Sequence, residues 1–161
     1  MDLYQKKGLP DEDELIICTV KRLNPHSAFV KLEEYQDVEG MLHLSEVALK
    51  GVKRIKDHLS KGQKIVCKVL EVKDSEVDVS LKRVKKAEKR RKLNESRLEK
   101  RFYKIITHAC DKAGNTESIN NLMDSLINKY DTILNAYEAL KQEGLRVLQG
   151  IEVPSKVKPV L

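Results

Sequence analysis

The sequence predicts a chain of two parts, a small five-stranded β-barrel followed by an all-α helical domain. As far as residue 81, apolar residues come in short β-branched runs, whereas from residue 98 onward they recur every three or four positions. Between these parts, residues 82–101 (KRVKKAEKRRKLNESRLEKR) hold eleven of the 31 lysines and arginines against three glutamates, a local balance of +8. A length of 161 residues suits two small domains. We therefore predict domains at 1–84 and 85–161.

Five segments of the first part have strand composition, since they are short and rich in β-branched residues. They cover residues 15–23, 28–32, 38–42, 65–73 and 76–81. Asn24-Pro25 breaks the chain after the first segment, and Asp74-Ser75 forms a tight hairpin between the last two. Five short strands with one long loop before the final hairpin predict a closed barrel of the OB type, which has no exposed sheet edge.

The second part has helical periodicity, and its apolar stripes are predicted to pack on one another as a core. The first stripe comprises Leu98, Phe102, Ile105 and Ala109. Gly114 is expected to end this helix. Asn115 or Thr116 is expected to cap a second helix, and Asp131 or Thr132 a third.

The composition narrows the class of protein. A net charge of +6 favours a polyanionic partner such as nucleic acid. The apolar runs are far shorter than the ~20 residues of a membrane span, and the polar N-terminus lacks an export signal, so a cytoplasmic protein is expected. Cys18, Cys67 and Cys110 have no CxxC spacing and are expected to be reduced and buried, with no metal bound.

Two basic clusters are the candidate RNA-binding sites, where lysine and arginine would hold phosphates without reading base sequence. The basic loop comprises Lys50, Lys53, Arg54 and Lys56. The joint cluster comprises Lys85, Lys86, Lys89, Arg90, Arg91 and Lys92, and is expected to lie on the solvent side of a long helix. The alternative for the joint cluster is a solvated helical connector without a partner.

Four landmarks in order carry a resemblance: AFV at 28–30, EGMLHLSE at 39–46, KGQ at 61–63, and KVLEVK at 68–73 followed by VSLKR at 79–83. Together they resemble the S1 RNA-binding domain, an OB fold. The resemblance implies base stacking on His26, Phe29 and His43, although Ser27 replaces the usual glycine and His26 the usual aromatic residue.

The alternative for this sheet face is that Phe29 belongs partly to the core and that both histidines are ordinary surface or packing residues. Four nearby acidic residues favour that alternative because they would repel phosphate groups. They are Glu33, Glu34, Asp37 and Glu39.

Across its whole length the chain is similar to the alpha subunit of archaeal and eukaryotic translation initiation factor 2, and the archaeal form is the nearer match. The resemblance rests on the S1 landmarks followed by SLKRVKKAEKRRK, with YQKK at 4–7, Pro10 and FYKII at 102–106. It implies a non-enzymatic subunit of a heterotrimer, with beta and gamma subunits, that brings initiator methionyl-tRNA to the small ribosomal subunit.

The resemblance also bears on cofactors and on chain length. GTP is expected on the gamma subunit, and this sequence has no GxxxxGK[ST] phosphate loop, so no cofactor is expected here. In the family an α/β domain that contacts gamma follows the helical domain, and because this chain stops at Leu161 we expect a fragment without it. In the eukaryotic proteins of this family a regulatory phosphorylated serine lies at the position of Ala48 here, so that switch is not expected. Ser45 is interpreted as a turn residue.

An enzyme is not expected, because the four histidines lack metal-ligand spacing. Two non-enzymatic alternatives to the initiation-factor subunit remain. The main alternative is an S1-type accessory subunit of an RNA-processing or transcription complex, which would bind single-stranded RNA through Phe29. A mimic that occupies kinases specific for this family is a third, but Ala48 and the helical domain weigh against it.

Overall fold

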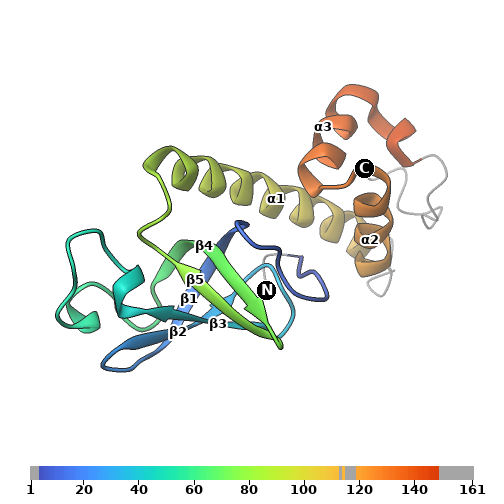
Figure 1. The fold of residues 1–161 in the computed structure, drawn as a ribbon. Helices are drawn as coiled ribbons and strands as arrows, with labels where there is room; N and C mark the ends of the chain where they lie inside the picture. Colours follow the sequence, from blue (N-terminus) through green and yellow to red (C-terminus); the bar gives the residue numbers. More distant parts are fainter. Residues whose placement is uncertain (1–3, 113, 115–118, 149–161) are drawn as a thin grey trace. The chain divides into compact units, whose positions relative to one another are not determined.

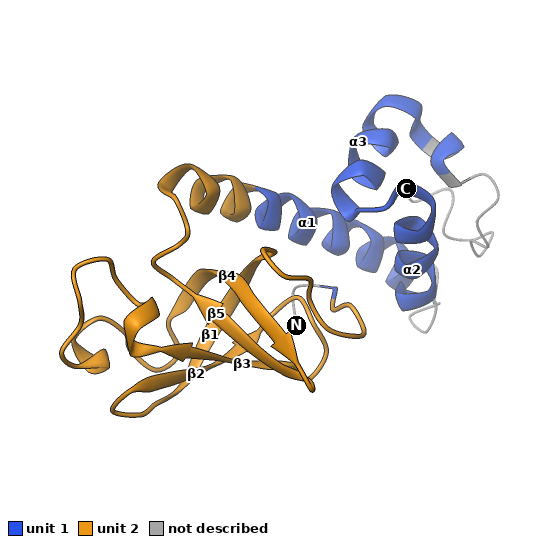
Figure 2. Ribbon diagram, viewed as in Figure 1, with its two compact units in different colours: residues 1–4, 95–161 blue, residues 5–94 orange. Residues whose placement is uncertain are grey.

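The computed structural model describes residues 4–112, 114 and 119–148 (Figure 1). The chain divides into two compact units, one formed by residues 5–94 and the other by residues 95–161 together with residues 1–4 (Figure 2). The first unit holds the β-barrel and the beginning of helix α1 (Lys86–Lys112). The second holds the remainder of α1 and the helices that follow it.

The barrel confirms the predicted fold class. Its five strands agree with the predicted segments to within one residue at each end, and are β1 (Leu15–Leu23), β2 (Ser27–Leu32), β3 (Glu39–His43), β4 (Lys64–Lys73) and β5 (Glu76–Ser80). The strands close in the order β1-β2-β3-β5-β4. All neighbouring pairs are antiparallel except β3 with β5. Closure leaves every strand paired on both sides.

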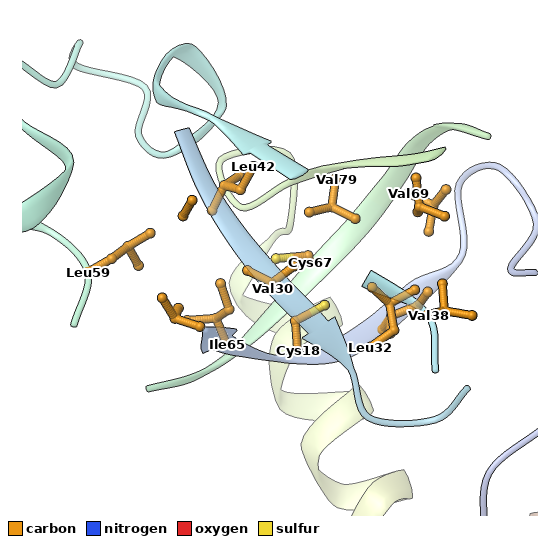
Figure 3. Packing of buried hydrophobic residues seen from close by; sticks show 14 of the residues in the cluster. Cys18, Val30, Leu32, Val38, Leu42, Leu59, Ile65, Cys67, Val69 and Val79 are labelled. Carbon is orange, nitrogen blue, oxygen red and sulfur yellow. The ribbon is translucent and has the colours of Figure 1, made fainter. Parts of the chain in front are cut away.

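Alternating side chains fill the barrel (Figure 3). On β2, Val30 and Leu32 point inward and are fully buried, as the period of two along a strand requires. Cys18 and Cys67 are also fully buried, which confirms their predicted role as small core residues. A hydrogen bond with the Cys67 thiol, together with burial, raises the pKa of the Cys18 thiol, so it stays protonated.

Strand β1 contains a bulge that changes the direction of its side chains. Val20 pairs with Val30, but the next pair on β2 joins Arg22 to Phe29, so Lys21 is an extra residue. Val20 points into the core, and both Lys21 and Arg22 are exposed. Strict alternation would have turned Arg22 inward after Lys21; the bulge keeps both cations outside.

The long loop between β3 and β4 is anchored in the barrel core. It contains two short 3-10 turns, Leu44–Glu46 and Ile55–Asp57. Val47, Ile55 and Leu59 are buried with the barrel residues, and Figure 3 shows Leu59 within this cluster. Because these apolar side chains fasten the loop, its intervening polar residues are held on the surface.

The helical unit confirms the predicted all-α domain. Helices α2 (Ile119–Tyr130) and α3 (Ile133–Glu143) follow α1, with a 3-10 turn at Gly144–Leu148. Its core contains Phe102, Ile106, Ala109, Cys110, Leu122, Met123, Leu126, Ile133, Ala136 and Val147. The predicted stripe on α1 is therefore offset, because Leu98 and Ile105 are each 37% exposed whereas Ile106 and Cys110 are buried.

The helix ends follow ordinary capping chemistry. Gly114 has φ 69° and its N–H donates to the Asp111 carbonyl, as expected of a residue that ends a helix. Thr132, not Asp131, caps α3, since its hydroxyl accepts a hydrogen bond of 3.1 Å from the Asn135 N–H. The predicted caps Asn115 and Thr116 lie outside the described residues. No helix in the described part of the chain is long and apolar enough to cross a membrane.

Candidate nucleic-acid interface

All four cations of the basic loop are exposed. Lys50 and Lys53 lie on either side of Gly51, which adopts φ 45°, and Arg54 and Lys56 flank the buried Ile55. Arg54 makes one ion pair, with Asp57 at 3.2 Å, and both side chains are at least half exposed. Such a pair is weak in water and leaves most of the guanidinium edge open to another anion. The loop therefore presents four positive charges on a rigid base.

The joint cluster divides into exposed and buried members. Lys85, Lys86, Lys89, Arg90 and Arg91 are exposed, as predicted. Lys92, in contrast, is only 9% exposed, and its ammonium lies 2.8 Å from a carboxylate oxygen of Glu34. The other Glu34 oxygen accepts a hydrogen bond of 3.0 Å from the Ile17 N–H of β1. The expectation that the whole cluster faces solvent was thus wrong for Lys92, which contacts the barrel.

The first turn of α1 is fastened to the barrel by a second carboxylate. Glu88 accepts from the Lys85 backbone N–H at 2.9 Å and pairs with Lys68 of β4 at 3.2 Å. These two contacts, the backbone one first, hold the pKa of Glu88 below its ordinary value. Glu88 and Lys92 are four residues apart and so lie on one face of the helix. That face contacts the barrel, and the other cations of the joint cluster are exposed to solvent.

Glu46 connects the basic loop to the linker before α1. Its carboxylate accepts from the Ser80 hydroxyl at 2.6 Å and from the Arg83 guanidinium at 3.2 and 3.3 Å. Its backbone carbonyl accepts from the N–H groups of Leu81 and Lys82. Burial favours the neutral acid, but these hydrogen bonds and the charges of Lys82 and Arg83 outweigh it and lower the pKa of Glu46. The carboxylate therefore fastens the start of the β3–β4 loop to the end of β5 and to the linker that precedes α1.

The predicted stacking residues do not form one open platform. His26 is exposed before β2. The Nδ1 of His43 lies 2.8 Å from the Ser45 hydroxyl and accepts from the Ser45 N–H, consistent with the turn role predicted for Ser45. Phe29 is half-buried, and the Arg22 guanidinium lies over its ring at 4.6 Å from the centroid. A cation therefore covers one face of the Phe29 ring.

Three of the four acidic residues near this face are engaged by the barrel. Glu34 is buried against Lys92. Glu33 accepts a 2.6 Å hydrogen bond from the Thr19 hydroxyl, and Glu39 pairs with Lys21 at 2.6 Å. This Lys21 contact holds the pKa of Glu39 below its ordinary value. Pairing reduces the repulsion of phosphate that the sequence alone suggested.

Comparison with known proteins agrees with this geometry. A family model described as "S1 RNA binding domain" matches residues 9–84. The translation initiation factor 2 subunit alpha of Archaeoglobus fulgidus is 36% identical over 152 residues, which cover 92% of this chain and 57% of that protein. The protein of the same name from Methanocaldococcus jannaschii is 37% identical over 160 residues, covering 97% of this chain and 60% of that protein.

Solved structures extend the likeness to three dimensions. A chain in the crystal structure of the a/eIF2alpha-aDim2p-rRNA complex from Pyrococcus horikoshii OT3 superposes with a TM-score of 0.85 at 32% identity, covering 95% of this chain and 93% of that chain. This chain belongs to the archaeal translation initiation factor 2 alpha-subunit family. The intact alpha subunit of aIF2 from Pyrococcus abyssi likewise superposes with a TM-score of 0.85 at 33% identity, over 94% of this chain and 59% of that one.

The family assignment confirms the predicted resemblance and leaves the RNA-binding residues as predictions. The chain spans 57% of the Archaeoglobus alpha subunit and 60% of the Methanocaldococcus one. Within the S1 region, Lys21, Arg22 and Lys61 lie beside Phe29 or line a groove next to it, and none of them is among the predicted site residues. The dipeptide Lys21-Arg22 at the end of a strand does not indicate by itself that both side chains are exposed. Alternation would have placed one of the two inside the barrel.

Proposed function

We propose that this chain acts as the alpha subunit of a heterotrimeric translation initiation factor 2, with beta and gamma subunits, that carries initiator methionyl-tRNA to the small ribosomal subunit in the cytoplasm. The observation that carries the proposal is similarity to archaeal alpha subunits over both units of the chain, at 36 and 37% identity. An S1-type accessory protein of another complex would need only the barrel. Here the helical unit is matched as well, since the coverage reaches 92% and 97% of the chain.

In this proposal the chain contributes RNA backbone contacts and no chemistry. The contacts are made by the exposed members of the two basic clusters, and Lys92 is omitted because Glu34 holds its ammonium in a buried pair. The crystallised complex that contains a related chain also includes ribosomal RNA, which supports an RNA partner. GTP binds the gamma subunit, and this chain requires no cofactor. The described residues include no group of three or more acidic, histidine or cysteine side chains able to hold a metal ion.

The proposal is tested by fluorescence anisotropy with labelled initiator tRNA across a range of salt concentrations. The test variant carries glutamine at the five exposed joint positions: Lys85, Lys86, Lys89, Arg90 and Arg91. Each lost phosphate contact should lower the slope of log affinity against log salt by about 0.7 to 0.9. We expect weaker tRNA binding and a shallower slope.

A matched control removes five exposed lysines outside both basic clusters: Lys7, Lys73, Lys104, Lys112 and Lys141. It has the same net charge as the test variant, so it should retain the wild-type slope if location matters. Equal losses in both variants would show only a general charge effect and would contradict the joint surface. Preference for an unstructured RNA, with no sensitivity to the joint, would instead favour the S1-type accessory subunit.

A further inference from the structure

We propose that charge separation along the barrel gives this chain a single orientation toward RNA, because carboxylates at one end of the barrel exclude phosphate while cations gather at the other end. The inference rests on the proposed function, which supplies the RNA partner. It goes beyond the basic loop and the joint cluster, because it assigns a role in selectivity to acidic residues that contact no RNA.

The strand directions divide the connecting segments of the barrel into two groups. Neighbouring strands are antiparallel except β3 with β5, so β1, β3 and β5 run one way and β2 and β4 run the other. The segments before β1, between β2 and β3, and between β4 and β5 therefore share one end, here called the acidic end (residues 5–14, 33–38 and 74–75). The remaining segments form the basic end (residues 24–26, 44–63 and 81–85), and Figure 1 shows the two groups on opposite sides of the barrel.

Backbone hydrogen bonds join the segments within each end. At the acidic end, the Lys6 N–H donates to the Glu34 carbonyl at 2.8 Å. At the basic end, the Leu44 N–H donates to the His26 carbonyl at 2.8 Å. Each end is therefore a bonded surface whose charges keep their places.

Charge is divided between the two ends in mirror-image proportion. The acidic end holds eight carboxylates against two lysines, and the basic end holds eight lysines and arginines against two carboxylates. The ten residues of β4 extend between the two ends, roughly 30 Å at the rise of a β-strand. Exposed charges are largely screened beyond about 8–10 Å at physiological ionic strength. Each end therefore acts on a nearby phosphate by its own sign.

Most carboxylates of the acidic end face solvent. Three are engaged by neighbours: Glu34 by Lys92, Glu14 by the Tyr35 hydroxyl and Glu33 by the Thr19 hydroxyl. The other five are exposed, and they are Asp11, Glu12, Asp13, Asp37 and Asp74. A phosphate brought to this end would meet their negative charges.

Three of the exposed carboxylates occupy turn positions that favour a short polar side chain but do not require a charge. Asp13, Asp37 and Asp74 have φ of 65°, 52° and 49°. Asparagine and aspartate are the non-glycine residues that best tolerate this left-handed region. Asparagine would serve the backbone equally well, so turn geometry does not explain why all three residues are charged. Exclusion of phosphate from this end does explain it.

A polyanion that approaches the barrel is thus attracted to one end and repelled by the other. Such a field orients a charged partner before contact and raises the rate of productive encounters. Like-charge juxtaposition also disfavours wrong modes of association. The basic end leads directly into the joint cluster, because α1 begins at Lys86. The orientation that the barrel imposes therefore presents the basic loop and the joint cluster to the RNA.

Photocross-linking measures this orientation directly. A benzophenone maleimide is attached to Leu49→Cys at the basic end or to Gln36→Cys at the acidic end, both at exposed positions. The three native cysteines are buried, which limits their labelling. The RNA probes are initiator tRNA and an RNA hairpin of unrelated sequence. We expect the label at position 49 to cross-link each RNA about ten-fold more than the label at position 36.

Neutralising the acidic end should open a second orientation. The test variant adds Glu12→Gln, Asp13→Asn, Asp37→Asn and Asp74→Asn to the chain labelled at position 36. Its cross-linking yield should rise about three-fold or more at low salt, and the rise should shrink at high salt, where exposed charges are screened. The control variant changes net charge equally in the helical unit, through Asp111→Asn, Asp131→Asn, Glu138→Gln and Glu143→Gln, all at exposed positions. It should leave the yield at position 36 unchanged.

Three results would overturn the orientation: equal yields from the two labels, a yield at position 36 that does not respond to the test variant, or an equal rise in the control variant. Circular dichroism confirms that the variants are folded. The tRNA affinity of the joint-neutralised variant is measured separately. If that affinity falls while the two labels give equal yields, only the orientation proposal fails. If the affinity is unchanged, the proposed function fails, and the yields with the unrelated hairpin still decide the orientation.

Discussion

Lys92 and Glu34, 58 positions apart in the sequence, form an almost fully buried ion pair of 2.8 Å that fastens the start of α1 to the barrel. Glu34 also receives the Ile17 N–H, so both of its oxygens are bonded. Lys92, one lysine of a strongly basic segment, therefore has a structural role. Lys89 and Arg90, on the same stretch of helix, are exposed.

Lys92→Met should destabilise the barrel unit by about 3–5 kcal/mol, because it leaves the buried Glu34 carboxylate without its cation. The double variant Lys92→Met with Glu34→Gln should recover much of that loss, since the amide oxygen still accepts from Ile17 and no charge is buried. Urea unfolding followed by circular dichroism measures both. Lys89→Met, at an exposed position of the same helix, is the control and should change stability by less than about 0.5 kcal/mol. If Lys92→Met were as stable as Lys89→Met, the Lys92–Glu34 pair would not stabilise the barrel unit.

Glu46 should make stability depend on pH in the acid range. Because its pKa in the folded state is lowered below the ordinary value of 4.5, its contribution is complete above that value and is lost as the pH falls through the lowered pKa. Glu46→Gln should therefore reduce stability at neutral pH and flatten its decline below about pH 4.5. Urea unfolding at successive pH values tests this. Parallel curves for the two proteins would show that Glu46 is not responsible.

Gly40→Ala should destabilise the barrel by about 1–3 kcal/mol through crowding. A Cβ at Gly40 would lie 3.1 Å from Leu32 Cδ1 and 3.2 Å from the Val77 carbonyl oxygen, where β3 passes β5. Alanine is otherwise favoured over glycine in a strand by roughly 0.5–1 kcal/mol, so strand preference alone predicts the opposite sign. Measuring the free energy of unfolding distinguishes crowding from strand preference. A gain in stability would show that Leu32 and Val77 shift to accommodate the added methyl group without cost.

Thr132→Ala should destabilise the helical unit by about 1 kcal/mol, because it removes the hydroxyl that accepts from the Asn135 N–H at the start of α3. Thr132→Ser keeps that oxygen and should be within a few tenths of a kcal/mol of the wild type. Thermal unfolding monitored by helical circular dichroism compares the two. Equal losses would indicate that the threonine methyl group, rather than the cap, stabilises the helix.

Much of the candidate interface was predictable, because clusters of lysine and arginine can be recognised directly in the sequence and such clusters are usually exposed. Four exposed cations of the basic loop and five of the joint were recognisable without a structure. Lys92 was not distinguishable from its neighbours, since its partner Glu34 comes from a loop between β2 and β3. Phe29 lies on the outer face, as predicted. The contact of Arg22 with its ring depends on the β1 bulge, which no local sequence pattern predicts.

The two-part architecture, the five strands and the helical segments follow from the order of residues along the chain, because apolar periodicity and turn residues act over short distances. Which charges are buried, which face of α1 contacts the barrel and which side Arg22 occupies become visible only in the folded chain. Those outcomes depend on pairs such as Lys92 with Glu34 and Ser80 with Glu46, whose members are distant in the chain. These pairs contribute interaction energy only once the closed barrel brings their members into contact. Patterns of neighbouring residues in the sequence therefore cannot predict them.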